Sequence, residues 1–123
     1  MYRVAIITIS DKGAAGQRED LSGPAIQELA EQAGYAVTRT EMIPDEQARI
    51  SALLAEIADQ NQADLLLTTG GTGFAPRDVT PEATLAIAER AVPGIGEAMR
   101  TYSLTITPRA MLSRATAAIA NRP

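Results

Sequence analysis

The chain has 123 residues, of which 46% are hydrophobic and 3% aromatic, and its formal net charge at pH 7 is −4. This length fits one domain with a largely aliphatic core, and the negative charge argues against a large nucleic-acid-binding face. The sequence contains no histidine and no cysteine, which excludes Ser-His-Asp catalysis, thiol chemistry and zinc sites built from these residues. Carboxylates, hydroxyls, guanidinium groups and one ammonium, that of Lys12, remain, and this set suits Mg²⁺ and phosphate ligands.

Composition and hydropathy also predict a location. No apolar run approaches the roughly 18 residues of a membrane span. The N-terminus enters strand-like sequence at once instead of a signal peptide. With no cysteine for disulfide bonds, these features predict a cytoplasmic protein that has neither a membrane nor a nucleic acid as a partner.

The first half of the chain predicts two strands, each followed by a helix. Residues 3–10, RVAIITIS, predict a buried strand that ends in a polar turn, and residues 14–20 predict a loop. A helix should begin near Ser22 and stop at Gly34. Residues 35–43 predict a less buried strand, and residues 46–59 predict a second helix. The apolar faces of the two helices consist of Ile26, Leu29, Ala30 and Ala33, and of Ile50, Leu53, Leu54, Ile57 and Ala58.

Residues 65–81, LLLTTGGTGFAPRDVTP, form the stretch around which the rest of the chain is organised. Its apolar beginning predicts a strand that is buried on both faces and ends at Thr69. A glycine loop that a ligand can approach closely follows the strand. This loop consists of Gly70, Gly71, Thr72 and Gly73.

The glycine loop leads into a predicted helix start. Thr80 is expected as the N-cap, Pro81 at the first helical position and Glu82 in the first turn. A strand, a glycine loop and a helix N-terminus together form the usual anion or nucleotide site of α/β proteins. The carboxylate of Asp78 beside such a site suggests a divalent metal.

The last third of the chain predicts mostly helix. We expect helices at residues 82–91, 97–104 and 107–112, a bend at residues 92–96, and an i,i+3 pair between Glu97 and Arg100. Residues 115–120 predict a final strand, and residues 121–123 a turn. The whole order predicts an α/β three-layer sandwich with a mostly parallel central sheet.

Two aspartates admit more than one interpretation. Asp45 stands where an N-cap belongs, so it could satisfy the first amides of the following helix or face a ligand. Asp78 could be a metal or phosphate ligand, or a solvated acid in a loop. Arg77, its neighbour, is expected to form a surface ion pair with Asp78.

The remaining polar positions are also open to a purely structural role. The glycine loop lacks the lysine of a Walker loop and the spacing of a dinucleotide fingerprint, so it is either a turn or a ligand loop of another kind. Thr72 and Thr80 are caps or ligands. Ser10 and Asp11 form a polar turn after the first strand, and Ser113 could simply end a helix.

Four further segments, read with the central stretch, resemble one protein family in register and in order. These are Ser10-Asp11, Ile43-Pro44-Asp45, the PGIGEAMR run at residues 93–100, and the MLSR run at residues 111–114. The glycine loop followed by RDVTPEA and then by PGIGEAMR is highly specific. The chain is similar over residues 1–120 to the MogA/MoaB family, the molybdopterin-binding fold that is also found in gephyrin and its plant counterpart.

The resemblance implies an activity and a set of site residues. Adenylyltransferases of this family transfer AMP from Mg-ATP to the terminal phosphate of molybdopterin and release pyrophosphate, in molybdenum cofactor biosynthesis. It implies that Asp45 and Asp78 are catalytic and hold Mg²⁺. The implied nucleotide and pterin site consists of Ser10, Asp11, Thr69, Gly70, Gly71, Thr72, Gly73, Thr80, Pro81, Glu82 and Ser113. The alternative is a MoaB-like carrier that binds molybdopterin without catalysis.

The resemblance also implies partners and an expected difference in length. Family members assemble as trimers or hexamers and pass their product to a metal-insertion protein downstream. Relatives continue through a hairpin into a strand, an Asn-Leu-Pro-Gly type loop and a closing helix. We therefore expect a single domain over residues 1–123 that lacks this C-terminal strand, loop and helix.

Overall fold

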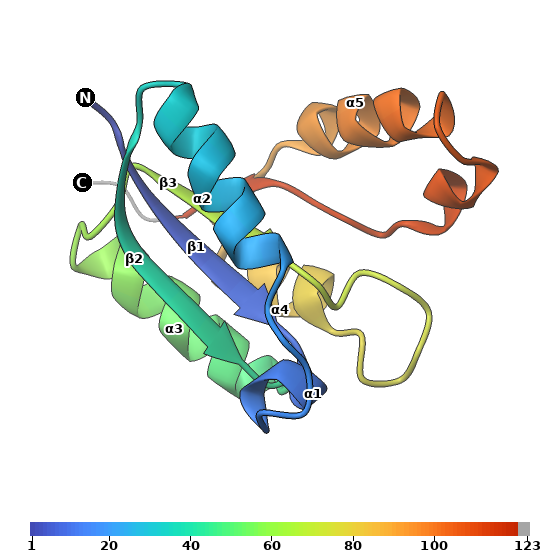
Figure 1. Cartoon of the computed structure of the whole chain (residues 1–123), viewed down its shortest axis with the longest axis horizontal. Coiled ribbons are helices and arrows are strands. Elements are labelled where there is room, and N and C mark those ends of the chain that lie inside the picture. The colour runs from blue at the N-terminus through green and yellow to red at the C-terminus, as the bar shows by residue number, and fades with distance from the viewer. Residues whose placement is uncertain (121–123) are drawn as a thin grey trace.

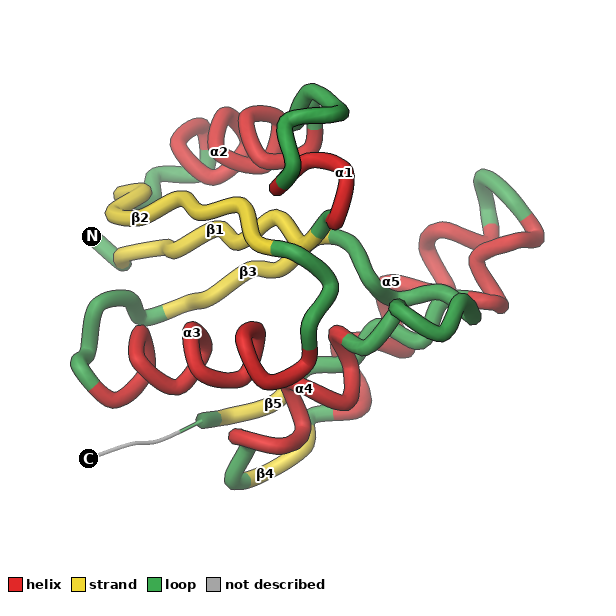
Figure 2. Tube along the Cα trace, turned by 90° about the horizontal axis from the view of Figure 1, so that it is seen from below, coloured by secondary structure: helices red, strands yellow, loops and turns green. Residues whose placement is uncertain are grey.

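The computed structural model describes residues 1–120, and its centre is a three-stranded parallel sheet. The strands are β1 (Arg3–Ile9), β2 (Ala36–Ile43) and β3 (Leu65–Thr69), in the order β2-β1-β3. Helix α2 (Ser22–Gln32) covers one face of the sheet and α3 (Gln47–Asp59) covers the other, as Figure 2 shows. The predicted α/β architecture with a parallel central sheet is thus confirmed.

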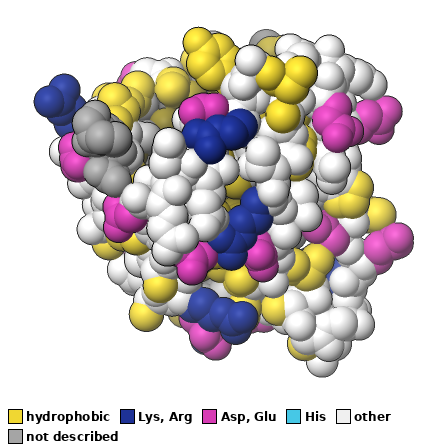
Figure 3. All heavy atoms as spheres, turned by 90° about the vertical axis from the view of Figure 1, so that its left-hand side faces the viewer, with side chains coloured by type: hydrophobic (Ala, Val, Ile, Leu, Met, Phe, Trp, Pro, Cys, Tyr) yellow, Lys and Arg dark blue, Asp and Glu magenta, His cyan; other side chains and the backbone are white. Residues whose placement is uncertain are grey.

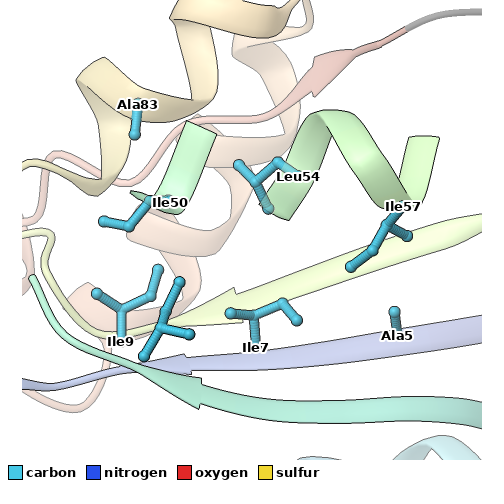
Figure 4. Packing of buried hydrophobic residues seen from close by; sticks show 8 residues of the cluster. Ala5, Ile7, Ile9, Ile50, Leu54, Ile57 and Ala83 are labelled. Carbon is cyan, nitrogen blue, oxygen red and sulfur yellow. The ribbon is translucent and has the colours of Figure 1, made fainter. Parts of the chain in front are cut away.

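The main core lies between the sheet and α3. Alternate residues of β1, namely Ala5, Ile7 and Ile9, meet the helix stripe of Ile50, Leu54 and Ile57 (Figure 4). Every one of these side chains is at most 3% exposed. Ala83 of α4 (Thr80–Ile87) completes the cluster, so the helix that follows the glycine loop is anchored in the same core. The apolar stripe predicted for residues 46–59 therefore packs against the central strand, as expected.

Two predictions about burial were wrong. The strand at Leu65–Thr69 was expected to be buried on both faces, but it is an edge strand among residues 1–120 and Leu65 is 41% exposed. The central strand is β1, because both neighbours pair with it. Leu29 was expected on the apolar face of the first long helix, but it is 65% exposed in α2. The buried residues of this helix are the small ones, Gly23 and Ala30.

The short helix α1 (Asp11–Ala14) follows β1 directly and occupies the predicted polar turn. The Ser10 hydroxyl oxygen accepts a hydrogen bond from the Gly13 N–H at 3.0 Å and so caps this helix. Residues 15–21 have no regular structure, so the predicted loop at residues 14–20 is confirmed except at Ala14, which ends α1. These elements place α1 at the carboxyl end of β1 (Figure 1).

The second half departs from prediction between residues 88 and 96. Helix α4 ends at Ile87, and Arg90–Ala91 forms a short strand, β4, that pairs antiparallel with β5 (Ala118–Ile119). Residues 92–96 are not a bend, because α5 (Pro93–Leu104) begins at Pro93, where a proline at the first helical position costs no hydrogen bond. The predicted final strand is confirmed only at β5, and the predicted turn at residues 121–123 lies outside the described residues.

Helix α5 and the 3-10 helix η1 (Pro108–Leu112) extend away from the sheet, and we call them the α5 arm (Figure 1). The Thr107 hydroxyl oxygen accepts a hydrogen bond from the Arg109 N–H and caps η1, as expected for a helix at residues 107–112. Within residues 1–120, no helix is both long and apolar enough to cross a membrane.

Candidate active site

The glycine loop follows β3 and is shaped by two close approaches of the backbone. Gly70 has φ +101°, and a Cβ there would lie 2.2 Å from the carbonyl oxygen of Ile9. Gly71 has φ +72°, and a Cβ there would lie 2.2 Å from Thr80 Oγ1. Both a left-handed backbone and a lack of space therefore require glycine at these positions.

Thr80 supports this loop instead of capping α4, so its predicted N-cap role was wrong. Its side chain is 2% exposed, and its hydroxyl donates to the Gly70 carbonyl oxygen at 2.8 Å. Its N–H donates to the carbonyl oxygen of Gly71 at 3.1 Å. The helix includes Thr80 itself, and the preceding residue, Val79, makes no side-chain cap. Thr80 thus joins the start of α4 to the glycine loop.

Asp11 and Asp45 join the ends of β1 and β2 through a reciprocal pair of hydrogen bonds. The Asp11 N–H donates to Asp45 Oδ2 at 2.9 Å, and the Asp45 N–H donates to Asp11 Oδ1 at 2.9 Å. Helix α3 begins two residues after Asp45 and has no side-chain cap, so the capping interpretation of Asp45 was wrong. Burial raises the pKa of Asp45, and the negative charges of Asp11 and Asp78 act in the same direction.

Arg77 binds Asp11 with two parallel hydrogen bonds. Its Nε donates to Asp11 Oδ2 and its terminal nitrogen to Asp11 Oδ1, each at 2.8 Å. The expected Arg77–Asp78 ion pair was therefore wrong, because the loop turns the guanidinium toward the end of β1. This partner holds the pKa of Asp11 below its ordinary value. Both oxygens of Asp11 are engaged, and the residue links the loops that follow β1, β2 and β3.

Asp78 shapes the second part of the loop. Its Oδ2 accepts a hydrogen bond from the Ala75 N–H at 3.0 Å, and its own N–H donates to the Ala75 carbonyl oxygen at 2.9 Å. A Cβ at Gly73 would lie 2.8 Å from Asp78 Oδ2, so the carboxylate is folded back over the glycine loop. Asp78 is near enough to Asp45 for its charge to raise the Asp45 pKa.

These two carboxylates fit a Mg²⁺ ion that arrives with a nucleotide. A Cβ at Gly71 would lie 3.1 Å from Asp45 Oδ1, so that oxygen faces the glycine loop. Residues 1–120 contain no cluster of three acidic side chains that could hold a metal alone. Mg²⁺ typically takes one or two carboxylates and completes its shell with water and substrate phosphates. Two carboxylates that both lie against the glycine loop are compatible with that arrangement.

The other predicted site residues lie around this centre. Thr69 is the last residue of β3, and Pro81 is buried in the first turn of α4. The Thr72 carbonyl oxygen accepts a hydrogen bond from the Arg114 N–H at 2.9 Å. Ser113 lies beside Arg114 and lines a hollow of about 390 Å³ under the α5 arm. The hollow itself is lined by residues of the α5 arm and of the segment that follows it, and Ser113 connects it in sequence to the Arg114 contact with the glycine loop.

Sequence reasoning missed Arg114 as a member of the site and gave Arg100 the wrong partner. Arg114 donates to the Gly73 carbonyl oxygen, to the Asp78 carbonyl oxygen and to the Glu82 carboxylate, at 2.8, 2.5 and 2.6 Å. Arg100 donates to the Ala115 carbonyl oxygen at 2.6 Å, so the expected pair with Glu97 was wrong. No local pattern signals these contacts, because the partners are main-chain carbonyls and, for Arg114, also the Glu82 side chain, in segments that are brought close only by folding.

Comparisons with known proteins agree with this geometry. Residues 5–123 match the family described as "Probable molybdopterin binding domain". The molybdopterin adenylyltransferase of Escherichia coli K12 is 47% identical over 114 residues, which are 91% of this chain and 58% of that protein. The enzyme of the same name from Helicobacter pylori J99 is 42% identical, over 97% of this chain and 69% of that protein.

Solved structures show the same similarity. The crystal structure of the molybdopterin biosynthesis enzyme MoaB from Thermus thermophilus superposes with a TM-score of 0.91 at 47% identity. The match covers 98% of this chain and 76% of that one. The chain thus spans between about half and three quarters of the length of these relatives. The match over nearly all of its residues confirms the predicted resemblance, and the chain belongs to the molybdopterin-binding domain family.

Proposed function

We propose that this chain carries the adenylyl-transfer site of a molybdopterin adenylyltransferase in molybdenum cofactor biosynthesis. Two curated relatives that are 42–47% identical carry this name. The observation that carries the proposal is that the Asp45 and Asp78 carboxylates both lie against the glycine loop, at the carboxyl ends of parallel strands. Open α/β sheets bind their ligands at this edge.

The reaction needs little covalent chemistry from the protein. An oxygen of the terminal phosphate of molybdopterin attacks the α-phosphorus of ATP, the bond from that phosphorus to the bridging oxygen breaks, and pyrophosphate leaves. The attacking phosphate is already ionised, so no general base is required. A chain without histidine or cysteine can therefore serve, provided that it aligns the two anions and stabilises the transferred charge.

The named residues have distinct tasks in this proposal. Asp78 and Asp45 would hold Mg²⁺, which neutralises phosphate charge when it is bound. The amides of the glycine loop would contact phosphate or pterin oxygens. Asp11 and Arg77 keep Asp45 in place through the hydrogen bonds described above. Ser113 and the hollow under the α5 arm would receive part of the molybdopterin.

Pyrophosphate release from Mg-ATP, measured with and without molybdopterin, tests the activity. Release should require the pterin. Asp78→Asn should reduce turnover by about 10²-fold or more, because it removes a charge that acts on the transferred phosphate, while pterin binding should change little. Asp59→Asn, an exposed acid at the end of α3, is the control and should behave like the wild type. Pterin binding without any release would instead support the carrier.

We also propose self-association, as a trimer or hexamer, and a downstream metal-insertion protein as a partner. Exposed apolar side chains on and beside the α5 arm support self-association, since Tyr102 is 70% and Ile106 71% exposed. Tyr102→Lys should shift the sedimentation profile toward monomer. Leu21→Lys changes a side chain that is 71% exposed but lies outside the arm, and should not shift it. Equal profiles for both variants would refute the role of the arm.

A further inference from the structure

Arg114 reaches the loop beside the proposed Mg²⁺ site with every part of its guanidinium group. Its Nε donates to the Gly73 carbonyl oxygen at 2.8 Å, and one terminal nitrogen donates to the Asp78 carbonyl oxygen at 2.5 Å. The other terminal nitrogen forms an ion pair with Glu82 Oε2 at 2.6 Å. The two carbonyls mark the beginning and the end of the segment that folds back over the glycine loop.

The contacts extend to the backbone of Arg114. Its N–H donates to the carbonyl oxygen of Thr72 at 2.9 Å. The guanidinium keeps the pKa of Glu82 below its ordinary value, so the ion pair persists at neutral pH. The side chain is only 33% exposed. Arg114 therefore holds the loop from one side while the Asp78 carboxylate holds the Ala75 N–H from within.

The geometry of these contacts requires arginine. A guanidinium offers donors in a rigid planar fork, and here the fork is shared among two carbonyl oxygens and one carboxylate. A lysine would provide one compact ammonium group, which cannot satisfy all three acceptors in this geometry. The carbonyl oxygens of Gly73 and Asp78 would then lose a charge-assisted partner, and the loop between them would loosen.

We infer that Arg114 is a positioning residue that orders residues 73–78, so that the Asp78 carboxylate is set for Mg-ATP. This inference rests on the proposed function and adds a residue to it. Arg114 acts through Asp78, because its contacts at that residue are to the main chain and leave the carboxylate for other partners. Replacing a residue that supports a metal ligand without touching the metal typically costs roughly 10–100-fold in metal affinity or activity.

Two measurements on Arg114→Lys test the inference. Hydrogen exchange of the Ala75, Asp78 and Thr80 amides reports loop order without any ligand, because each of them has a partner within the loop. Exchange at these amides should become faster in the variant. The Mg-ATP concentration for half-maximal pyrophosphate release should rise about tenfold or more, with a much smaller change in kcat at saturation.

Arg3→Lys is the matched control, because Arg3 has a similar network at the opposite end of the sheet. It donates to Asp64 and to the Asn61 carbonyl oxygen, and the Arg3–Asp64 pair is 36% and 39% exposed. Basic and acidic side chains lie beside one another on the face shown in Figure 3, which is the left-hand side of Figure 1. Arg3→Lys should leave both loop exchange and the Mg-ATP dependence unchanged.

A milder variant guards against simple loss of folding. Glu82→Gln keeps both carbonyl contacts of Arg114 and removes only the charge of its partner, so it should show a smaller change in the same direction. Unchanged loop exchange in Arg114→Lys would overturn the inference, as would faster exchange without a change in Mg-ATP dependence. If the wild-type protein releases no pyrophosphate, the proposed function fails, and the exchange measurement still decides whether Arg114 orders the loop.

Discussion

Replacing Gly71 by alanine tests whether the glycine loop has the shape described here. The residue has φ +72°, a left-handed conformation that an L-amino acid disfavours. An added Cβ would lie 2.2 Å from Thr80 Oγ1 and 3.1 Å from Asp45 Oδ1. The substitution therefore strains the backbone and also displaces the side chain that joins the loop to α4.

The expected loss of stability is the sum of two parts. The left-handed conformation costs about 1–2 kcal/mol for a residue with a Cβ. Displacing the Thr80 hydroxyl breaks its hydrogen bond to the Gly70 carbonyl oxygen, and burial of the unsatisfied groups costs about 1–3 kcal/mol. Together these give roughly 2–5 kcal/mol, a large part of the about 5–15 kcal/mol by which a typical domain is stable.

Urea unfolding of three alanine variants separates the two parts. Gly16 has φ +75° and no atom within 4 Å of an added Cβ, so Gly16→Ala should show the backbone cost alone. Gly94 in the first turn of α5 has neither restriction, and Gly94→Ala should be neutral or stabilising by up to about 1 kcal/mol. The free energy of unfolding should therefore fall most for Gly71→Ala.

A double variant checks the cause of the steric part. Thr80→Ala removes the Oγ1 atom that the new Cβ would meet, so Gly71→Ala combined with Thr80→Ala should cost less than the sum of the two single changes. The reasoning is refuted if Gly71→Ala costs no more than Gly16→Ala, or if the two changes at the loop are simply additive.

Three further predictions concern charge and packing. Burial raises the pKa of Asp45, so Mg-ATP affinity should weaken as the pH falls through that raised pKa, at a higher pH than for an ordinary aspartate. Calorimetry should show that this pH dependence disappears in Asp45→Asn. Asp11 has a lowered pKa, so it adds stability above its unfolded-state pKa that is lost as the pH falls through the folded one. Arg77→Gln should raise the Asp11 pKa, as measured by NMR titration, and reduce this pH-dependent stability, because only the Asp45 N–H would still favour the ionised carboxylate. An unchanged pKa would contradict the bidentate contact. Leu54→Ala should destabilise the protein by about 2–5 kcal/mol in urea unfolding. Leu29→Ala on the exposed side of α2 should stay within about 0.5 kcal/mol, and equal losses would contradict the burial described here.

Local features of the site could be predicted from the sequence because their causes lie within a few residues. The apolar stripe of α3 follows from helical spacing, and three glycines in four residues after an apolar strand indicate a loop of unusual backbone shape. Thr107 before η1 and Pro108 at its first position likewise predict a short helix there. Asp45 and Asp78 were selected together only through the family resemblance, since each alone fits a cap or a loop acid.

Contacts between distant segments required the tertiary structure. The two apolar strands, β1 and β3, look alike in sequence, and only the crossovers place β1 in the centre with β3 at the edge. Asp11 meets Arg77 across 66 residues of sequence, and Arg114 meets the Asp78 carbonyl across 36. Hydrogen-bond partners that are this far apart leave no periodic signal, because each depends on how several helices and strands pack. The sequence by itself therefore determined most of the helices and strands and the chemistry available. The packing of the three loops at the carboxyl ends of the strands decided which carboxylate is held by an arginine and which lie against the glycine loop.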